Sequence, residues 1–184
     1  MNASSQSAFT LMELLISLSI IAILMAISFP AAHDFMTRTQ DEILQAQLLR
    51  AIEIAKREAR ATHTPVALCQ SNNQMTCAGN WQDGQLIFLD EQMDGVVHGN
   101  DQILTVMRTQ SQHGSIHWRA FPGYRHYLLF LPTGFLHSDN GTFWHCHADK
   151  PIWAIIISKV GRTRVALPDE KGEIRDSHGK LLSC

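Results

Sequence analysis

A long apolar run without any charged side chain lies near the N-terminus of this sequence. Between Leu14 and Ala32 there is no Asp, Glu, Lys or Arg. Because a helix rises by about 1.5 Å per residue, a run of this length nearly spans the hydrocarbon core of a bilayer. The hydropathy therefore predicts a transmembrane helix ahead of the rest of the chain.

A single carboxylate, Glu13, lies at the start of this run. No Lys or Arg precedes Arg38, so nothing within a helical turn can pair with Glu13. A carboxylate inside a membrane span costs about 2.5–3.5 kcal/mol on insertion scales. A partner from elsewhere is therefore expected, and the free α-amine of a neighbouring copy would serve if the chain were cut before Phe9.

The segment Ala8–Leu14, AFTLMEL, resembles the class III signal of type IV prepilins and pseudopilins. The resemblance implies cleavage between Ala8 and Phe9 by a membrane prepilin peptidase and methylation of the new N-terminus. It also implies that Glu13 aids assembly with the neighbouring subunit. Ala8 stands where the family usually has Gly, and the leader, residues 1–8, has no Lys or Arg. A secretory signal fits less well, because it needs a basic start and a small-residue cleavage site after the apolar stretch.

Pro30 lies inside the expected helix. Its ring removes a backbone donor and clashes one turn back. We expect a kink or a locally melted turn, with a kink favoured because the helical pattern resumes afterwards. A proline at this place also resembles pilins, in which it marks a flexible point used in packing the filament.

After the anchor, the pattern predicts a helix from about Thr37 to Ala61. One apolar face recurs at spacings of three and four residues and should lie on a sheet; it comprises Leu44, Leu48, Ala51, Ile52, Ala55 and Ala59. On the outer side, Glu53 is expected to pair with Arg57. Short runs of strand-forming residues separated by turn clusters then predict eight strands, at residues 66–69, 85–89, 102–108, 115–120, 126–131, 141–147, 153–160 and 163–167. No internal repeat is recognised.

One long helix followed by many short antiparallel strands predicts an α+β fold. The head also resembles the GspH/FimT family of minor pilins and pseudopilins, through Val66–Cys69, Cys77, Trp81, Gly84, Phe88, Asp90, Phe130, Pro132, Gly134, Ile155–Ser158 and Gly161–Arg164. The resemblance implies a type IV pilin-like fold, in which a long N-terminal helix, transmembrane in its first half, packs on an antiparallel β-sheet head. The expected organisation is a leader (1–8), a transmembrane half of the spine helix (9–35), an amphipathic half (36–63) and an extracytoplasmic head with a basic C-terminal tail (64–184).

Four cysteines are present, Cys69, Cys77, Cys146 and Cys184. An even number in an exported chain favours two disulfides. Of the three possible connectivities we favour Cys69–Cys77 with Cys146–Cys184, because the first pair is close in sequence. Free buried thiols are the alternative, and a zinc site is less favoured because no CxxC spacing occurs.

The sequence offers little support for catalysis, a metal or a cofactor. His145 and His147 should share one face of a strand while Cys146 points away, which gives two metal ligands without a third. The acidic stretch from Asp83 to Asp101 has five acids and no base. It lacks the spacing of an EF-hand, so a solvated loop is expected. No catalytic motif is found, and we expect a non-enzymatic protein.

Positive charge gathers in the C-terminal part of the chain, where residues 108–184 hold ten Lys or Arg against six Asp or Glu. Within the segment KVGRTR, Gly161 can supply the positive φ of a tight turn. Arg162 and Arg164 should then project from one face of a strand, roughly 6.7 Å apart. Guanidinium groups at this spacing suit successive phosphates. A Cys146–Cys184 bond would fold the tail back and could gather further cations beside them.

In the family, a GRxR turn here is associated with DNA binding by FimT-type minor pilins in natural transformation, whereas GspH-type pseudopilins share a similar turn without that role. We therefore expect a minor pilin that binds double-stranded DNA without sequence preference, and we keep a structural pseudopilin of type II secretion as the alternative. The expected DNA-binding residues are Lys159, Gly161, Arg162, Arg164, Lys171, Arg175 and Lys180. Expected partners are other pilins, the prepilin peptidase and DNA. The chain should cross the bacterial inner membrane once, with its head in the periplasm, and become extracellular when assembled.

Overall fold

The structure is a computed structural model that describes residues 10–108, 114–120, 123, 125–137 and 140–184. The expected leader and the cleavage position between Ala8 and Phe9 lie outside the described residues. The chain separates into two units, residues 1–39 and 40–184, and each is described by itself.

The first unit contains the N-terminal part of helix α1 (Leu11–Thr62). Its segment Leu11–Phe29 has a mean hydropathy of 2.4 and is long and apolar enough to cross a membrane. The large apolar side chains of this segment are exposed on all sides, as expected for a surface that faces lipid.

The helix continues through residue 30, so the locally melted turn considered for Pro30 is not formed. One missing donor leaves the neighbouring helical hydrogen bonds in place. The Pro30 side chain lies outside the described part, and its kink stays a prediction.

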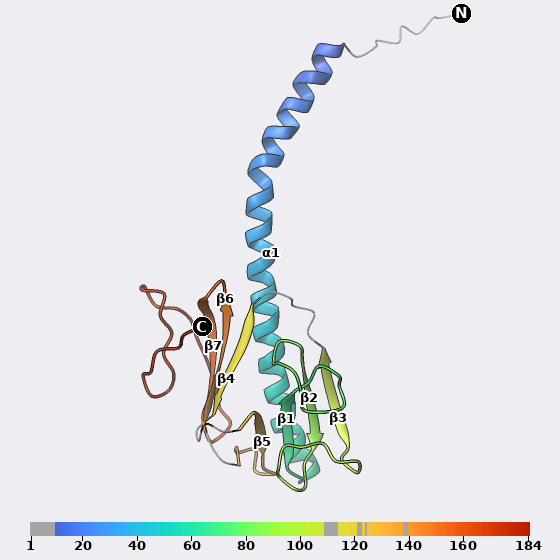
Figure 1. Ribbon diagram of the computed structural model, residues 1–184, viewed down its shortest axis with the longest axis vertical. Coiled ribbons are helices and arrows are strands. Elements are labelled where there is room, and N and C mark those ends of the chain that lie inside the picture. The colour runs from blue at the N-terminus through green and yellow to red at the C-terminus, as the bar shows by residue number, and fades with distance from the viewer. Residues whose placement is uncertain (1–9, 109–113, 121–122, 124, 138–139) are drawn as a thin grey trace, which may run out of the picture. The chain divides into compact units, whose positions relative to one another are not determined.

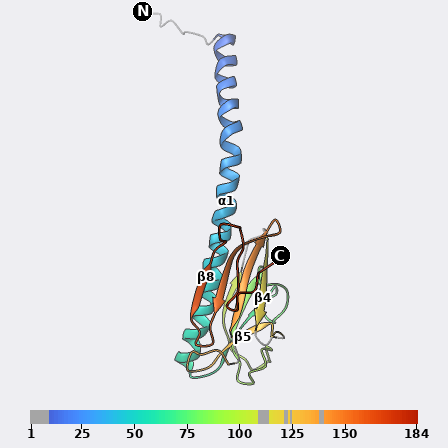
Figure 2. The same ribbon diagram turned by 90° about the vertical axis from the view of Figure 1, so that its left-hand side faces the viewer.

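Among the residues that the structure describes, the second unit combines the C-terminal part of α1 with eight strands. Figure 1 shows their arrangement, and Figure 2 labels β8. The strands are β1 (Val66–Gln70), β2 (Gly84–Leu89), β3 (Ile103–Arg108), β4 (Ser115–Ala120), β5 (Tyr127–Phe130), β6 (Gly141–His147), β7 (Lys150–Ile157) and β8 (Thr163–Ala166). All pairings between the named strands are antiparallel, and they form two four-stranded sheets with the orders β3-β2-β1-β5 and β4-β6-β7-β8. The α+β arrangement predicted from the sequence is confirmed.

The main core of the second unit lies between α1 and the inner faces of both sheets. The predicted apolar helix face is confirmed, since all six of its residues are at most 1 % exposed. It packs against side chains from both sheets, such as Leu68 of β1 and Phe143 of β6. One amphipathic helix therefore packs against both sheets, which share no pairing among the described strands.

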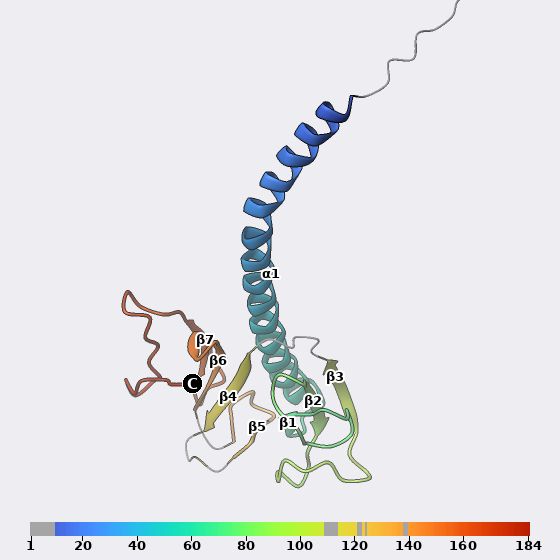
Figure 3. The ribbon, with the colours of Figure 1, turned by 45° about the horizontal axis from the view of Figure 1, so that its top comes forward.

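The outer face of each sheet is also apolar and is covered by loop segments, and on each sheet one of these segments is closed by a disulfide. On the first sheet, Phe88 and its neighbours pack against Cys77 and Val97 of the covering loops. On the second sheet, the C-terminal tail inserts Ile174 and Leu182 beside Trp144. The tail doubles back beside β6 and β7, as Figures 1 and 3 show. The disulfides join Cys69 to Cys77 and Cys146 to Cys184, the pairing favoured from the sequence.

A buried polar pair, Asp41 of α1 and His145 of β6, joins the helix to the second sheet within the second unit. The ring Nε2 of His145 lies 2.8 Å from Oδ1 of Asp41, and the indole of Trp153 donates to the Asp41 carbonyl at 3.0 Å. His145 is fully buried and stacks on Trp153 at 5.2 Å between ring centroids. His145 and Cys146 project to opposite faces of β6, as predicted, and the His145 ring serves packing between helix and sheet.

The expectation of a fully solvated acidic loop is wrong for Asp90. This side chain is buried, and it accepts the backbone N–H of Gly95 at 2.8 Å and that of Asp94 at 3.3 Å. Burial raises the pKa of the Asp90 carboxyl above its ordinary value, against the opposing effect of these hydrogen bonds. Asp90 therefore organises the loop after β2, whereas Asp94 and His98 form an exposed pair at 3.0 Å.

Candidate functional site

The turn between β7 and β8 spans Ser158–Arg162 and is held by its own hydrogen bonds. Ser158 N–H donates to the Arg162 carbonyl at 2.9 Å, and Gly161 N–H donates to the Ser158 carbonyl at 2.8 Å. The Ser158 hydroxyl also bonds the backbone of Arg162 at 3.2 Å, as donor to its carbonyl and as acceptor of its N–H. Residues 158–160, which the sequence assigned to the strand, therefore belong to the turn.

Two other segments pin this turn to the body of the head. Lys56 of α1 donates its Nζ to the Gly161 carbonyl at 2.8 Å, and Leu136 N–H donates to the Lys159 carbonyl at 2.9 Å. Gly161 has a φ of +70°, and a Cβ there would lie 2.7 Å from the carbonyl oxygen of Gly134. Only glycine meets both conditions without strain, so the predicted role of Gly161 in the turn is confirmed.

Arg162 and Arg164 lie on one exposed face beside the turn. Arg164 pairs with Ile156 across the ladder between β7 and β8. A groove of about 570 Å³ brings both guanidinium side chains together with three hydroxyl side chains; its lining residues are Ile156, Ser158, Arg162, Thr163, Arg164 and Ser177. Among the described residues, neither arginine forms an ion pair. Strand β8, labelled in Figure 2, lies at the edge of its sheet.

The C-terminal tail contains two consecutive turns of the same construction, at residues 169–173 and 176–180. In each, the Asp side chain accepts the backbone N–H groups two and four residues further on, all at 2.9 Å. Each turn also has a glycine with positive φ three residues after the Asp, Gly172 at +76° and Gly179 at +78°. The absence of an internal repeat inferred from the sequence is therefore wrong for DEKGEIR and DSHGKLL, two seven-residue segments in tandem.

The tail cations predicted to join the two arginines are distributed differently. Arg175 forms an ion pair with Glu173 at 2.7 Å, which offsets its charge. Lys171 is exposed in the first tail turn and does not line the groove. Lys180 lines a neighbouring cavity, and Lys159 is exposed in the β7–β8 turn. The fold thus brings Arg162 and Arg164 together, and none of the tail cations lines their groove.

The neighbouring cavity, of about 250 Å³, lies between the second tail turn and strands β4 and β6. Arg119 of β4 bonds Asp176 at 3.2 Å and lies over the Trp144 ring at 5.1 Å. Burial raises the pKa of the Asp176 carboxyl, but the N–H groups of His178 and Lys180 and the Arg119 guanidinium outweigh it, so the net pKa is lowered. Asp176 is therefore ionised at neutral pH and braces the turn.

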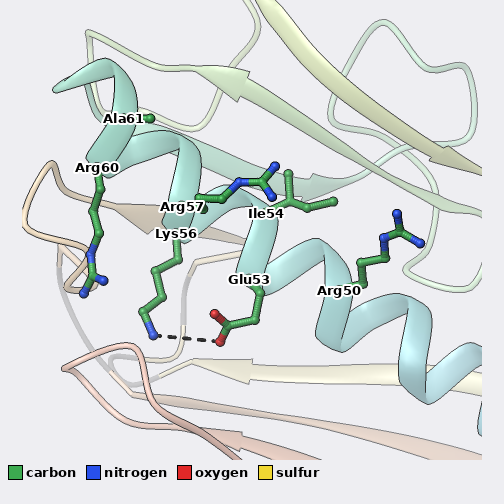
Figure 4. Close-up of a pocket in the computed structure, with 7 residues that line it drawn as sticks. All are labelled: Arg50, Glu53, Ile54, Lys56, Arg57, Arg60 and Ala61. Atoms are coloured by element: carbon green, nitrogen blue, oxygen red, sulfur yellow. Dashed lines mark ion pairs between the residues drawn. The ribbon is translucent and has the colours of Figure 1, made fainter.

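A second basic surface lies on α1 and was not predicted from the sequence. A depression of about 680 Å³ is lined by Arg50, Glu53, Ile54, Lys56, Arg57, Arg60 and Ala61, which Figure 4 shows. The expected pair of Glu53 with Arg57 is wrong. Glu53 lies 3.8 Å from Lys56, and Arg57 bonds its neighbour Glu58 at 2.9 Å. The Nζ of Lys56 thus lies near the Glu53 carboxylate and also donates to the Gly161 carbonyl of the β7–β8 turn. The spacing of cations along the helix was the signal available in the sequence.

The side chains of the groove beside the β7–β8 turn can bind an anion of extended shape. Two guanidinium groups offer planar donors that match phosphate oxygens, and the hydroxyls of Thr163 and Ser177 add neutral donors, while the Ser158 hydroxyl is used within the turn. Within the described ranges, no three His, Cys, Asp or Glu side chains gather as metal ligands. The site is an open surface whose two arginines extend from a backbone that the turn and β8 hold in place.

Comparisons with known proteins agree with this organisation. The family model described as the type II transport protein GspH matches residues 45–161, which is more than half of the chain. The model of the prokaryotic N-terminal methylation motif matches residues 3–29. No curated protein matches the chain.

Two crystal structures of the type IV minor pilin FimU from Pseudomonas aeruginosa, strain PAO1, are similar to the chain. The form in space group P21 is 17 % identical with a TM-score of 0.49, and the form in P65 is 18 % identical with a TM-score of 0.47. Each comparison covers 70 % of this chain and 91 % of the FimU chain.

The GspH match covers most of the head, and the methylation motif covers the apolar segment that is long enough to span a membrane. A chain with this N-terminal motif is membrane-anchored, with its head in the periplasm. Such proteins are structural subunits that assemble with other pilins in a filament. The chain therefore belongs to the GspH family and is a GspH/FimT-like minor pilin or pseudopilin of a type IV filament system.

Proposed function

We propose that this minor pilin binds double-stranded DNA through the groove beside the β7–β8 turn and that it serves DNA uptake in natural transformation. Arg162 and Arg164 make the main contacts. Lys159 and Lys180 add charge at the rim, and Lys171 and Arg175 add weaker attraction from the tail. Gly161 contributes by shaping the turn.

The observation that carries this proposal is the pair of exposed arginines that form no ion pair among the described residues and share one groove with three hydroxyl groups. An arginine on a solvated turn ordinarily has little constraint. Here the backbone of Arg162 is fixed by Ser158, and the turn is fixed by Lys56. Because the backbone is fixed in advance, less conformational entropy is lost when a ligand binds.

The chemistry favours contacts with the DNA backbone. Arginine neutralises phosphates and releases condensed counterions, so binding should weaken steeply as salt rises. Contacts of this kind position a protein on DNA without reading its sequence. The groove offers two arginines and small hydroxyl side chains, which suit phosphate oxygens, so sequence preference is not expected.

The proposal includes a route to the filament. A prepilin peptidase cuts between Ala8 and Phe9, and the new N-terminus is methylated. The subunit is held in the bacterial inner membrane by one span, and its head becomes extracellular when the filament grows. Glu13 and Pro30 act in packing against neighbouring subunits.

Substitution of both arginines tests the DNA site. We expect the full chain in detergent to bind a fluorescent duplex, and Arg162→Ala with Arg164→Ala to weaken binding about 10-fold or more at 50 mM salt, because two phosphate contacts are lost. Fluorescence anisotropy measures the affinity.

A matched variant, Arg57→Ala with Arg108→Ala, removes the same charge from surfaces outside the groove. It should retain most of the affinity. Equal losses in the two double variants would show that net charge and not the groove governs binding, and would refute the site.

A second candidate function is that of a minor pseudopilin in type II secretion, which contacts other minor subunits and binds no DNA. The name of the matching family, a type II transport protein, favours it. The match ends at residue 161, so Arg162, Arg164 and the tail lie beyond it. A strain that carries the double arginine variant separates the two functions. Lost transformation with normal secretion supports DNA uptake, whereas a null strain that loses secretion alone supports the pseudopilin.

A further inference from the structure

We propose that the second tail turn, residues 176–180, is the far wall of the DNA groove and that Ser177 contacts the same phosphate backbone as the two arginines. This inference rests on the proposed function. It adds to that function a contact residue outside the GRxR turn and a reason for the docked position of the tail.

Ser177 occupies a position that connects the two cavities of the head. It lines the groove with Arg162 and Arg164, and it also lines the neighbouring cavity that contains Lys180. A strand of phosphates that follows the surface from the arginines toward Lys180 therefore passes over Ser177. Serine is small and neutral, so it can donate a hydrogen bond there without closing the path.

The Ser177 hydroxyl is held by weak contacts that a phosphate can replace. Asn140 donates its Nδ2 to Ser177 Oγ at 3.4 Å, and His178 Nδ1 lies 3.2 Å from the same oxygen. Both distances are at the long end for hydrogen bonds. An ionised phosphate oxygen is a stronger acceptor, so the hydroxyl proton gains by turning toward it.

Rigid contacts on the other side of the turn keep Ser177 in position. Asp176 accepts two backbone N–H groups and the Arg119 guanidinium, and the Cys146–Cys184 bond closes the tail on the sheet. Trp144 donates its indole N–H to the Ser183 carbonyl at 3.0 Å. Asp176 and Arg119 thus act as positioning residues, and their mutual ion pair keeps the carboxylate from repelling phosphate.

Charge placed at position 177 tests the inference. In the full chain in detergent, Ser177→Lys should bind the duplex about 3–10-fold more tightly, and the slope of log K against log[salt] should become steeper by about 0.9, as for one added phosphate contact. Ser177→Glu should weaken binding about 10-fold, since it sets a carboxylate against the backbone. The salt slope is informative because a purely structural disturbance would not steepen it.

Ser183→Lys and Ser183→Glu are the controls. Ser183 is exposed on the same tail and outside both cavities, and its contact with Trp144 uses the backbone carbonyl. These variants should change affinity less than about 2-fold, because they add the same charge away from the path. Near-UV circular dichroism confirms that all four variants keep the wild-type fold.

The outcomes separate the inference from the function on which it rests. If the double arginine variant loses binding while the position-177 and position-183 variants behave alike, the tail is not part of the groove and the DNA site stands. If the wild-type chain binds no duplex, both the function and the inference fall.

Discussion

Gly161 shows how one residue controls the candidate site. Its positive φ closes the β7–β8 turn, and its missing Cβ lets the Gly134 carbonyl approach. Its own carbonyl accepts the hydrogen bond from Lys56 that ties the turn to α1. The next residue is Arg162, so the conformation of Gly161 sets the direction in which the first arginine leaves the turn.

A pair of alanine substitutions separates the two demands on this glycine. Gly161→Ala and Gly172→Ala introduce a side chain at nearly the same φ, +70° and +76°, but only at Gly161 does the new Cβ meet neighbouring atoms. We expect Gly172→Ala to cost about 1 kcal/mol and Gly161→Ala about 2–3 kcal/mol in unfolding free energy. Denaturant unfolding of the full chain in detergent measures both. Equal costs would mean that the contact with Gly134 is relaxed without penalty.

Single residues were predictable from the sequence where their role is local. The turn glycine and the alternation of Arg162 and Arg164 follow from four neighbouring residues and the strand period. Ser177 was not recognised, because its importance depends on where the tail docks. The pairing of Asp41 with His145 joins positions 104 residues apart, and no local pattern encodes such a partner.

The strands illustrate both the reach and the limit of sequence patterns. All eight were predicted, because apolar alternation and turn residues are local signals. Their division into two sheets was not foreseen, since pairing depends on contacts between distant segments such as β1 and β5. The end of β7 was set too late, because the run Ser158–Val160 lacks a turn signal of its own before Gly161.

The docked tail should depend on pH through Asp176. The lowered pKa of Asp176 means that its ionised form stabilises the folded head above the unfolded value, 3.8, and that this stabilisation is lost as pH falls through the lower folded value. At pH 7, Asp176→Asn should therefore lower the unfolding temperature by about 2–4 °C, the shift that 1 kcal/mol causes in a chain of this size. Below the folded pKa, the wild-type and variant temperatures should converge.

Thermal unfolding followed by near-UV circular dichroism at pH 7 and at pH 3 checks this expectation, with Glu170→Gln as the control for an exposed acid in the tail. A difference between wild type and Asp176→Asn that persists unchanged at pH 3 would rule out ionisation of Asp176 as the brace.

For the whole molecule, the anchor and the head carry separate tasks. The apolar segment Leu11–Phe29 and its methylation motif concern the membrane and the filament. The head carries the surface proposed to bind DNA, and two disulfides and a shared core hold that surface in place. Both parts support the family assignment. Whether the filament serves DNA uptake or type II secretion depends on whether the groove binds DNA.

Assembly is tested at Glu13. Because an unpaired carboxylate in a membrane span is costly, Glu13 should pair with the N-terminus of a neighbouring subunit. Glu13→Val should permit cleavage of the leader and yet reduce incorporation into filaments about 10-fold or more, if a pairing of about 1.4 kcal/mol is lost. Immunoblots of sheared filaments and of membranes measure the two steps. The control Ser17→Val, one turn along the same helix, should assemble normally. If Glu13→Val also assembles normally, the pairing of Glu13 with a neighbouring N-terminus is refuted.

The salt dependence of DNA binding tests the proposed function most directly. The affinity of the full chain for a duplex is titrated from 50 to 200 mM salt, for the wild type, for Arg162→Ala with Arg164→Ala, and for Arg57→Ala with Arg108→Ala. Loss of two phosphate contacts should make the slope of log K against log[salt] shallower by about 1.8 in the first variant and leave it unchanged in the second. Identical slopes for all three proteins, or no binding by the wild type at low salt, would contradict a DNA-binding groove at the Gly161–Arg164 turn.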